Sequence, residues 1–314
     1  MCGRYANSRR PEDLVEEFEV DRTTGPGPGK DPSGAGADYN VAPTKPALVV
    51  LTRHVAEDAE APDADPDAPE PDDPPVAADE DGEPTADAAL EAAEAAPAAP
   101  APAPRMLRRL TWGLVPSWAK DRSVGNRMIN ARAESLLDKP AYRRAALSRR
   151  CLVPADGWYE WQKSPTERDA KGKPRKQPFW IHPGVDRPIA FAGVYEFWRD
   201  PEKEGDDAWL TTFAIVTTAA EPGLDVIHDR MPFVVPEDRW GDWLDPDVTD
   251  PDAVRALLQP PVPGRFVPTP VSLRVNAVSN NGPELLEPVP LDQLRGVVDP
   301  ATGELIGAGE APLF

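Results

Sequence analysis

The second residue of the chain, Cys2, has the most distinctive chemistry that the sequence offers. Removal of Met1, which a small second residue permits, leaves an α-amine and a thiol on adjacent carbon atoms. An α-amine has a reference pKa of about 7.7–8.0, so part of it is neutral and nucleophilic at physiological pH. The amine can attack an aldehyde to give a Schiff base, and the thiol can then close a five-membered thiazolidine. The alternative interpretation is a cysteine that stands at position 2 by chance.

Two further residues are candidates for proton transfer. Glu160 follows Tyr159 and precedes Trp161, and a carboxyl between two aromatic rings is partly desolvated, which raises its pKa and suits acid–base work. The alternative is a glutamate on the solvent face of a strand. His228 stands two residues before Arg230, where an imidazole suits proton transfer near a phosphate. The alternative is a loop histidine without a role.

A third candidate is the segment NARAE at 130–134. In an extended strand it places the amide of Asn130 and the guanidinium of Arg132 on the same side, because side chains alternate along a strand. Arg132 can equally form a structural ion pair with Glu134.

The charge of the chain is unevenly distributed. The 314 residues have a formal net charge of −20, but residues 56–104 carry 16 acidic residues and no Lys or Arg. Ala, Pro and acidic residues make up 45 of these 49 positions, so we expect a disordered insert that cannot bury enough apolar surface to fold. Between residues 105 and 176, in contrast, 18 basic residues face 7 acidic ones. Aromatic residues interleave with them, a combination typical of single-stranded nucleic acid binding; a solvated helix with core tryptophans is the alternative.

Several classes of protein are excluded or disfavoured. The sequence has no apolar run of transmembrane length and no apolar segment near its N-terminus, so we expect neither a membrane span nor a secretory signal. Its two cysteines, Cys2 and Cys151, form no CxxC or Cys/His cluster, which excludes a disulfide framework and disfavours a zinc site. We expect a protein of the bacterial cytoplasm that uses no cofactor and no metal.

The predicted elements indicate an α+β fold, a mostly antiparallel, curved, barrel-like sheet with flanking helices. Short helices are expected at 8–20 and 139–150, and helical pieces at 240–257. We expect the insert to interrupt a connection between two strands, 47–52 and 106–114, where added length costs little. Further extended segments are expected at 151–161, 179–182, 189–197, 209–218 and 266–278. A single domain is expected over 2–290, interrupted by 56–104, with a flexible tail at 291–314.

Seven segments in order carry a resemblance to a known family. They are MCGRY at 1–5, YNVAP at 39–43, WGLVPSW at 112–118, NARAE at 130–134, RCLVPADGWYEW at 150–161, FAGVYEFW at 191–198 and HDRMP at 228–232. This ordered set resembles the SRAP family (SOS-response-associated peptidase, abasic-site processing). The resemblance extends from Cys2 to about residue 278 and is interrupted by the acidic insert.

The resemblance implies an activity and a set of site residues. Members of the family lose Met1 by self-cleavage and capture the aldehyde of an abasic site in single-stranded DNA as a thiazolidine. It implies that Cys2 is the nucleophile, that Asn130 holds the N-terminus and the opened sugar, and that Glu160 is the acid or base. By the same resemblance His228 assists ring opening. The implied DNA contacts are phosphate contacts by Arg4, Arg132 and Arg230, and base contacts by Trp112, Pro43 and Trp161.

Partners and alternatives complete these expectations. The partner implied by the resemblance is single-stranded DNA with abasic sites, and we expect a monomer. The chain ends in APLF, which is faintly similar to peptides that dock on bacterial sliding clamps, although the usual glutamine is missing. Two other functions stay open: an N-terminal-nucleophile amidohydrolase, in which the thiol of Cys2 attacks an amide, and a non-covalent single-strand binding module.

Overall fold

A computed structural model of the protein describes residues 2–23, 35–54, 103–205 and 208–307. The predicted disordered insert at 56–104 lies almost wholly outside the described residues, and the APLF terminus lies wholly outside them. Within the described residues no helix is long and apolar enough to cross a membrane.

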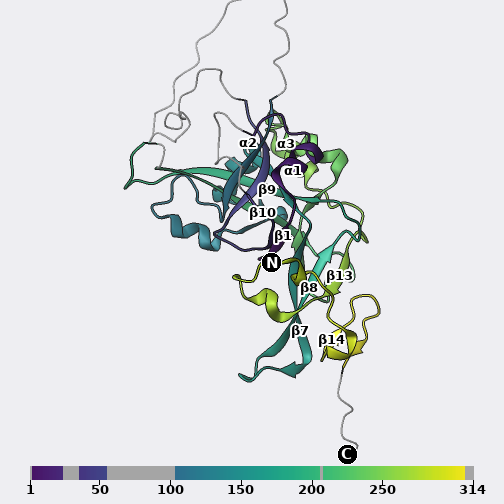
Figure 1. Cartoon of the computed structure of the whole chain (residues 1–314). Coiled ribbons are helices and arrows are strands. Elements are labelled where there is room, and N and C mark those ends of the chain that lie inside the picture. The colour runs from purple at the N-terminus through teal and green to yellow at the C-terminus, as the bar shows by residue number, and fades with distance from the viewer. Residues whose placement is uncertain (1, 24–34, 55–102, 206–207, 308–314) are drawn as a thin grey trace, which may run out of the picture.

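Five strands close into a barrel, which confirms the predicted α+β, barrel-like sheet (Figure 1). They are β3 (Pro46–Thr52), β4 (Arg105–Trp112), β6 (Arg150–Ala155), β9 (Ile189–Arg199) and β10 (Trp209–Ala219). The ring runs β10-β4-β3-β6-β9 and returns to β10 through the β9–β10 pairing. Only the β4–β10 pairing in this ring is parallel. Closure leaves these five strands without a free edge between them.

Three short strands extend the barrel sheet at its rim. Strands β5 (Asn130–Arg132) and β11 (Arg230–Pro232) both pair with β10, and β12 (Val234–Val235) pairs with β9. Because β5 and β11 share one partner, two segments that are about a hundred residues apart in sequence meet at one end of β10. Both segments contain predicted site residues.

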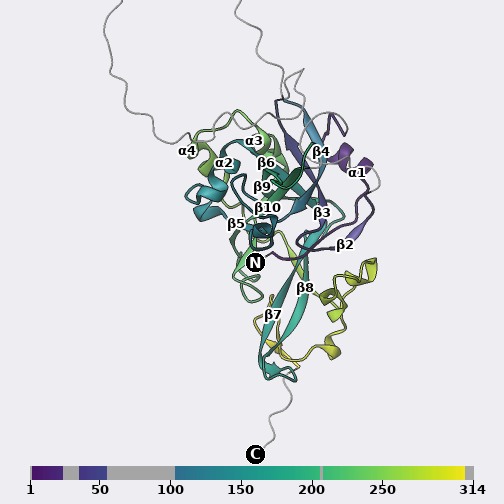
Figure 2. The same ribbon diagram turned by 90° about the vertical axis from the view of Figure 1, so that its left-hand side faces the viewer.

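A second sheet of five strands carries the N-terminus. Its order is β13 (Val267–Pro270), β8 (Pro174–His182), β7 (Gly157–Arg168), β1 (Tyr5–Asn7) and β2 (Asp38–Val41). The sequence predicted one extended segment at 151–161, but the structure divides it between two strands. The chain leaves the barrel after β6 and enters the second sheet as β7. The crossing occurs at Gly157, where a Cβ atom would lie only 2.4 Å from the carbonyl oxygen of Ile181. Strands β7 and β8 project from the barrel as a long hairpin (Figure 2).

The helices are short and cover the barrel. They are α1 (Pro11–Glu17), α2 (Pro140–Ser148), α3 (Trp240–Leu244) and α4 (Pro251–Leu257), which confirms the helices expected in these regions. The predicted start of the first helix is wrong by three residues. The structure begins it at Pro11, whose ring fixes the first helical φ angle, after Arg10 as N-cap. Phe18, which follows α1, stacks on Trp240 of α3 with ring centroids 4.3 Å apart.

The position expected for the acidic insert is confirmed. Strands β3 and β4 are antiparallel neighbours, with Thr52 opposite Arg105, so the chain from 53 to 104 leaves and re-enters the barrel at one end of this pair. Such a connection does not disturb the pairing of the barrel strands.

The predicted flexible tail is wrong for residues 291–307. This segment forms a 3₁₀ helix (Leu291–Gln293) and a hairpin of β14 (Val297–Val298) and β15 (Leu305–Ile306). Leu294 and Val297 are buried, and the side chain of Gln162 on β7 exchanges two hydrogen bonds of 2.8 and 2.7 Å with the backbone of Val298. The glycines and prolines mark turns that let a few apolar residues reach the core. The 266–278 segment is extended only in β13, and a 3₁₀ helix (Leu273–Asn276) follows.

Candidate active site

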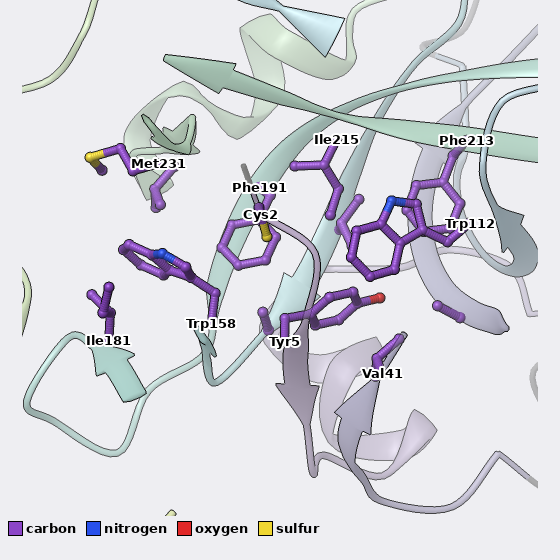
Figure 3. Close-up of a cluster of buried hydrophobic side chains, with 14 of the residues drawn as sticks. Cys2, Tyr5, Val41, Trp112, Trp158, Ile181, Phe191, Phe213, Ile215 and Met231 are labelled. Atoms are coloured by element: carbon purple, nitrogen blue, oxygen red, sulfur yellow. The ribbon is translucent and has the colours of Figure 1, made fainter. Parts of the chain in front are cut away.

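Cys2 lies in the largest apolar cluster, between the barrel and the second sheet. Its side chain is fully buried among residues that include Trp158, Phe191 and Met231 (Figure 3). Burial raises the pKa of the Cys2 thiol far above its ordinary value, and the nearby charge of Glu160 raises it further. The thiol is therefore protonated at neutral pH, and it needs a neighbouring group to take its proton before it can act as a nucleophile.

Asn130 holds the backbone of Cys2. It opens β5, which pairs with Ile215 of β10, and its Nδ2 donates a hydrogen bond of 2.7 Å to the Cys2 carbonyl oxygen. The other end of the amide, Oδ1, is buried and accepts no hydrogen bond from the described residues. An unsatisfied acceptor is costly in a protein interior, so this oxygen is available to accept a hydrogen bond from an N–H or O–H group of a bound molecule. The structure thus brings Asn130 and Cys2 together.

Glu160 reaches the same place from the second sheet. Strand β7 pairs with β1 at Tyr5 and Trp158, and the backbone N–H of Tyr159 donates to the carbonyl of Arg4. Glu160 is the next residue along β7, so it lies beside the first residues of the chain. Its side chain is buried, and this burial raises the pKa of the carboxyl to about 7. A carboxyl with this pKa can both give and take a proton near neutral pH.

His228 lies in the turn between β10 and β11. Burial lowers the pKa of its ring, which is therefore neutral at pH 7. Its Nδ1 accepts a hydrogen bond of 3.0 Å from the backbone N–H of Arg230. The carboxylate of Asp229 lies 2.9 Å from the same Nδ1 and would hold the ring if it became charged. These contacts fix the orientation of the ring.

The three arginines predicted to hold phosphates have different surroundings. Arg230 forms a two-bond ion pair with Glu134, at 2.6 and 2.9 Å, so the alternative pairing of Glu134 with Arg132 is not the one found. Arg132 is exposed and has no ion pair with any described residue. Arg4 donates to the side chain of Asn40 at 2.6 Å and to the carbonyl of Val275 at 2.8 Å. Arg132 is thus the arginine of the three that is open to an anion.

The predicted base contact of Trp112 needs correction. Trp112 is fully buried on β4, and its indole N–H donates to the carbonyl of Ile129 at 2.8 Å, so it offers no surface to a base. Trp161 and Pro43 are partly exposed, and Trp161 lies beside Arg4 and donates to Asn276. The two tryptophans of WGLVPSW therefore have opposite surroundings, and the prediction chose the buried one.

Trp118 is the aromatic residue that sequence reasoning missed. Its side chain is 67% exposed in the loop that follows β4, and Lys120, Arg122 and Arg127 in the same loop are also exposed. A signal was available, because Trp118 follows Pro116 and Ser117 and precedes a run of basic residues, which is typical of a surface loop. Among the described residues no group of His, Cys, Asp and Glu side chains is arranged to hold a metal ion.

The fold and the site together define a class of protein: a closed barrel whose N-terminal segment enters the core and carries a buried cysteine beside an amide and a carboxyl of raised pKa. The family model for SOS response associated peptidase (SRAP) matches residues 1–278. The chain belongs to this family, and the resemblance seen in the seven sequence segments is confirmed.

Two named relatives and one solved structure support this family assignment. The chain is 33% identical over 288 residues to the abasic site processing protein YoqW of Bacillus subtilis, covering 91% of this chain and 99% of the relative. It is 29% identical over 296 residues to the abasic site processing protein YedK of Escherichia coli, covering 92% and 100%. A crystal structure of a phage-related protein from Bordetella bronchiseptica is similar with a TM-score of 0.52 at 27% identity, over 86% of this chain and 94% of that one.

Proposed function

We propose that this protein processes abasic sites by capturing them covalently in single-stranded DNA, through the α-amine and thiol of Cys2 after Met1 has been removed. The single domain expected over 2–290, extended by the packed segment 291–307, is part of the proposal, as are the site residues Cys2, Asn130, Glu160 and His228. Support comes from the names of the relatives, which are called abasic site processing proteins. The observation that carries the proposal is the hydrogen bond from Asn130 to the Cys2 carbonyl beside a carboxyl with a pKa of about 7.

The proposed chemistry has two bond-forming steps. The neutral α-amine attacks the aldehyde carbon of the ring-opened sugar, and loss of water gives a Schiff base. The sulfur of Cys2 then adds to the imine carbon, the C=N electron pair moves to nitrogen, and nitrogen takes up the proton that the thiol gives up. Ring closure removes the iminium that would otherwise drive β-elimination and strand cleavage.

Glu160 is the proposed carrier of these protons. The buried thiol holds its proton at neutral pH, so sulfur attack needs an acceptor, and a carboxyl of pKa about 7 is ionised in a large fraction of molecules there. The same group, together with Asn130, is proposed to serve in the removal of Met1. His228, whose ring is neutral, is proposed to assist opening of the sugar ring and to contact the adjacent phosphate.

Single-stranded DNA is proposed to lie across the loop that carries Trp118 and past Arg132, where an exposed indole and exposed cations supply stacking and phosphate contacts. Arg4, Arg230, Trp161 and Pro43 stay proposed contacts. Arg230 would have to exchange its ion pair with Glu134 for a phosphate. No association with replication proteins is needed for this chemistry, and the protein is proposed to act as a monomer.

The test uses a single-stranded oligonucleotide with one abasic site, mixed with protein whose mass shows that Met1 is absent, and analysed by denaturing electrophoresis. A heat-stable shifted band, absent with an undamaged strand and absent with the Cys2→Ala protein, is expected. Equal retention of both strands without any covalent band would favour the single-strand binding module instead. Cleavage of small amides by protein that gives no band would favour the amidohydrolase.

A further inference from the structure

A cavity lies on the other side of Tyr5 from Cys2. It has a volume of about 310 Å³ and lies where β1 and β2 of the second sheet face β3 and β4 of the barrel. Figure 3 shows the hydroxyl of Tyr5 directed away from Cys2, on the side where Val41 lies. Neither Cys2 nor any of its three proposed catalytic partners lines this cavity. Its volume is at the lower end of the range of small-ligand sites.

The lining of the cavity combines apolar and positively charged groups. Val41, Ala47 and Leu48 contribute an apolar wall. Three basic side chains also line it, Arg9, Lys45 and Arg109, whereas Asp38 is the one acidic residue among the lining residues. An apolar wall next to an excess of positive charge suits a ligand that has both a flat organic part and an anionic part.

The three basic residues differ in whether they already form ion pairs within the protein. Arg9 is paired with Asp156 and Asp186, and Nζ of Lys45 lies 3.1 Å from the carboxylate of Asp38. Arg109 is half-buried on β4 and has neither a hydrogen bond nor an ion pair from its side chain to any described residue. A guanidinium is planar and can donate two parallel hydrogen bonds to one phosphate.

A second observation comes from Tyr5. Its side chain is fully buried, and its hydroxyl has no hydrogen-bond partner among the described residues. Burial raises the pKa of this hydroxyl well above its ordinary value, so it keeps its proton and can donate. Buried hydroxyls in proteins are nearly always hydrogen-bonded, so an unsatisfied one on a residue that lines a cavity indicates a missing polar partner.

We propose that this cavity binds a nucleotide through its phosphomonoester, with the phosphate on Arg109 and Lys45, the sugar or base against Val41 and Leu48, and a polar ligand atom on the hydroxyl of Tyr5. Two sources carry this chemistry: a free nucleotide and the phosphorylated end of a DNA strand. The site is separate from Cys2, and its occupancy does not depend on covalent capture.

The test is isothermal titration of the full chain, at low ionic strength and without abasic DNA. The probes are 2′-deoxyadenosine 5′-monophosphate, deoxyadenosine, inorganic phosphate, and one short oligonucleotide with and without a 5′-phosphate. The variants are Arg109→Ala, the milder Arg109→Lys, and Tyr5→Phe, which removes only the hydroxyl. Arg255→Ala, on the exposed face of α4, is the matched control.

We expect one phosphomonoester to bind per chain and to bind about tenfold or more weakly to Arg109→Ala, as loss of a charge-assisted hydrogen bond implies. Tyr5→Phe and Arg109→Lys should weaken binding by a smaller factor, and Arg255→Ala should leave it unchanged. Binding of the nucleotide alone, or of the 5′-phosphorylated strand alone, identifies the source. No binding of either, equal binding of deoxyadenosine or of inorganic phosphate, or unchanged affinity in Arg109→Ala would overturn the proposal.

Discussion

The protein has two regions in which a fully buried cysteine is accompanied by a buried glutamate, and they differ in how the polar groups are arranged. Cys2 and Glu160 lie where the second sheet meets the barrel, whereas Cys151 and Glu196 lie on the neighbouring barrel strands β6 and β9. The carbonyl oxygen of each cysteine accepts a hydrogen bond from a side chain, Asn130 at 2.7 Å in one case and Trp243 at 2.9 Å in the other.

The difference lies in the neighbours of the two thiols. Burial alone raises the pKa of Cys151, whereas at Cys2 the charge of Glu160 acts as well. Glu196 is bound by Arg149 at 2.9 Å, which fixes it as an ion-pair partner, and the Sγ of Cys151 packs within 2.8 Å of the position that a Cβ atom of Gly193 would occupy. Burial of a thiol therefore does not distinguish the two cysteines, whereas the carboxyl of raised pKa beside Cys2 does.

The largest expected effect separates the two cysteines. Cys2→Ala should give no heat-stable product with an abasic strand, because the α-amine alone can form only a reversible Schiff base and the thiol that closes the ring is lost. Cys151→Ala should give product at the rate of the natural sequence while lowering the free energy of unfolding by about 1 kcal/mol, the cost of a small cavity. Denaturing electrophoresis and urea unfolding measure the two quantities. Loss of product in a folded Cys151→Ala protein would contradict the assignment of capture to Cys2 alone.

The second prediction compares the glutamates in catalysis. Glu160→Gln should slow covalent capture about hundredfold or more, the usual contribution of a positioned acid or base. Glu196→Gln is the matched control and should leave the capture rate within a factor of about two in the molecules that remain folded. Single-turnover rates of capture of an abasic strand measure both variants. Equal slowing in Glu160→Gln and Glu196→Gln would contradict the role of Glu160.

Glu160 also predicts a dependence of stability on pH. Its pKa rises from a reference of about 4.3 in the unfolded chain to about 7 in the folded protein. The folded state then binds the proton more tightly, so this group stabilises the protein fully below the lower value and loses that contribution as pH rises through the upper one. Urea unfolding at pH 5 and pH 8 should show a smaller decrease in Glu160→Gln than in the natural sequence. An identical decrease in both would show that the pKa is not raised.

The fourth prediction compares the stability of the natural sequence with that of Glu196→Gln. Glu196→Gln removes the charge that Arg149 faces and leaves a largely buried guanidinium without an ionic partner. The free energy of unfolding should fall by about 3 kcal/mol, the lower end for a broken buried pair. Thermal or urea unfolding at pH 7 measures it, and a change below about 0.5 kcal/mol, as for an exposed pair, would contradict the structural role of this ion pair.

The smallest expected effect concerns DNA contacts rather than chemistry. Trp118→Ala should weaken binding of an undamaged single strand by about tenfold, as loss of one stacked base implies. It should not change unfolding, because the indole is 67% exposed. Trp112→Phe should do the reverse and destabilise the fold without weakening DNA binding of the folded protein. Fluorescence anisotropy measures affinity, and unchanged affinity in Trp118→Ala would remove this loop from the proposed DNA path.

The sequence predicted the fold class, the barrel strands on both sides of the insert and most helices, because their apolar runs and turn residues are local signals. It failed where a long-range contact decides the outcome. Gly157 is needed for a close approach to Ile181 across the second sheet, and the segment after Leu291 is ordered by Gln162, more than a hundred residues away. No local pattern reports contacts of this kind.

The site shows the same division. Cys2, Asn130 and Glu160 were found from residue type and motif, and the structure brings all three together. Trp112 and Trp118 could not be told apart, since both are tryptophans of one motif and only the fold decides which is buried. The pairing of Arg230 with Glu134, rather than Arg132 with Glu134, depends on β5 and β11 sharing β10 as their partner.

The most direct measurement is mass spectrometry of the captured product. The protein is reacted with an abasic strand, the DNA is digested to the sugar, and the tryptic peptide Cys2–Gly3–Arg4 is isolated after treatment with iodoacetamide. We predict that this peptide carries the sugar with loss of one water, and that its thiol resists alkylation because the sulfur and the α-amine are joined in one ring. An adduct on a lysine or on Cys151, or a Cys2 thiol that still alkylates, would contradict capture by the N-terminal cysteine.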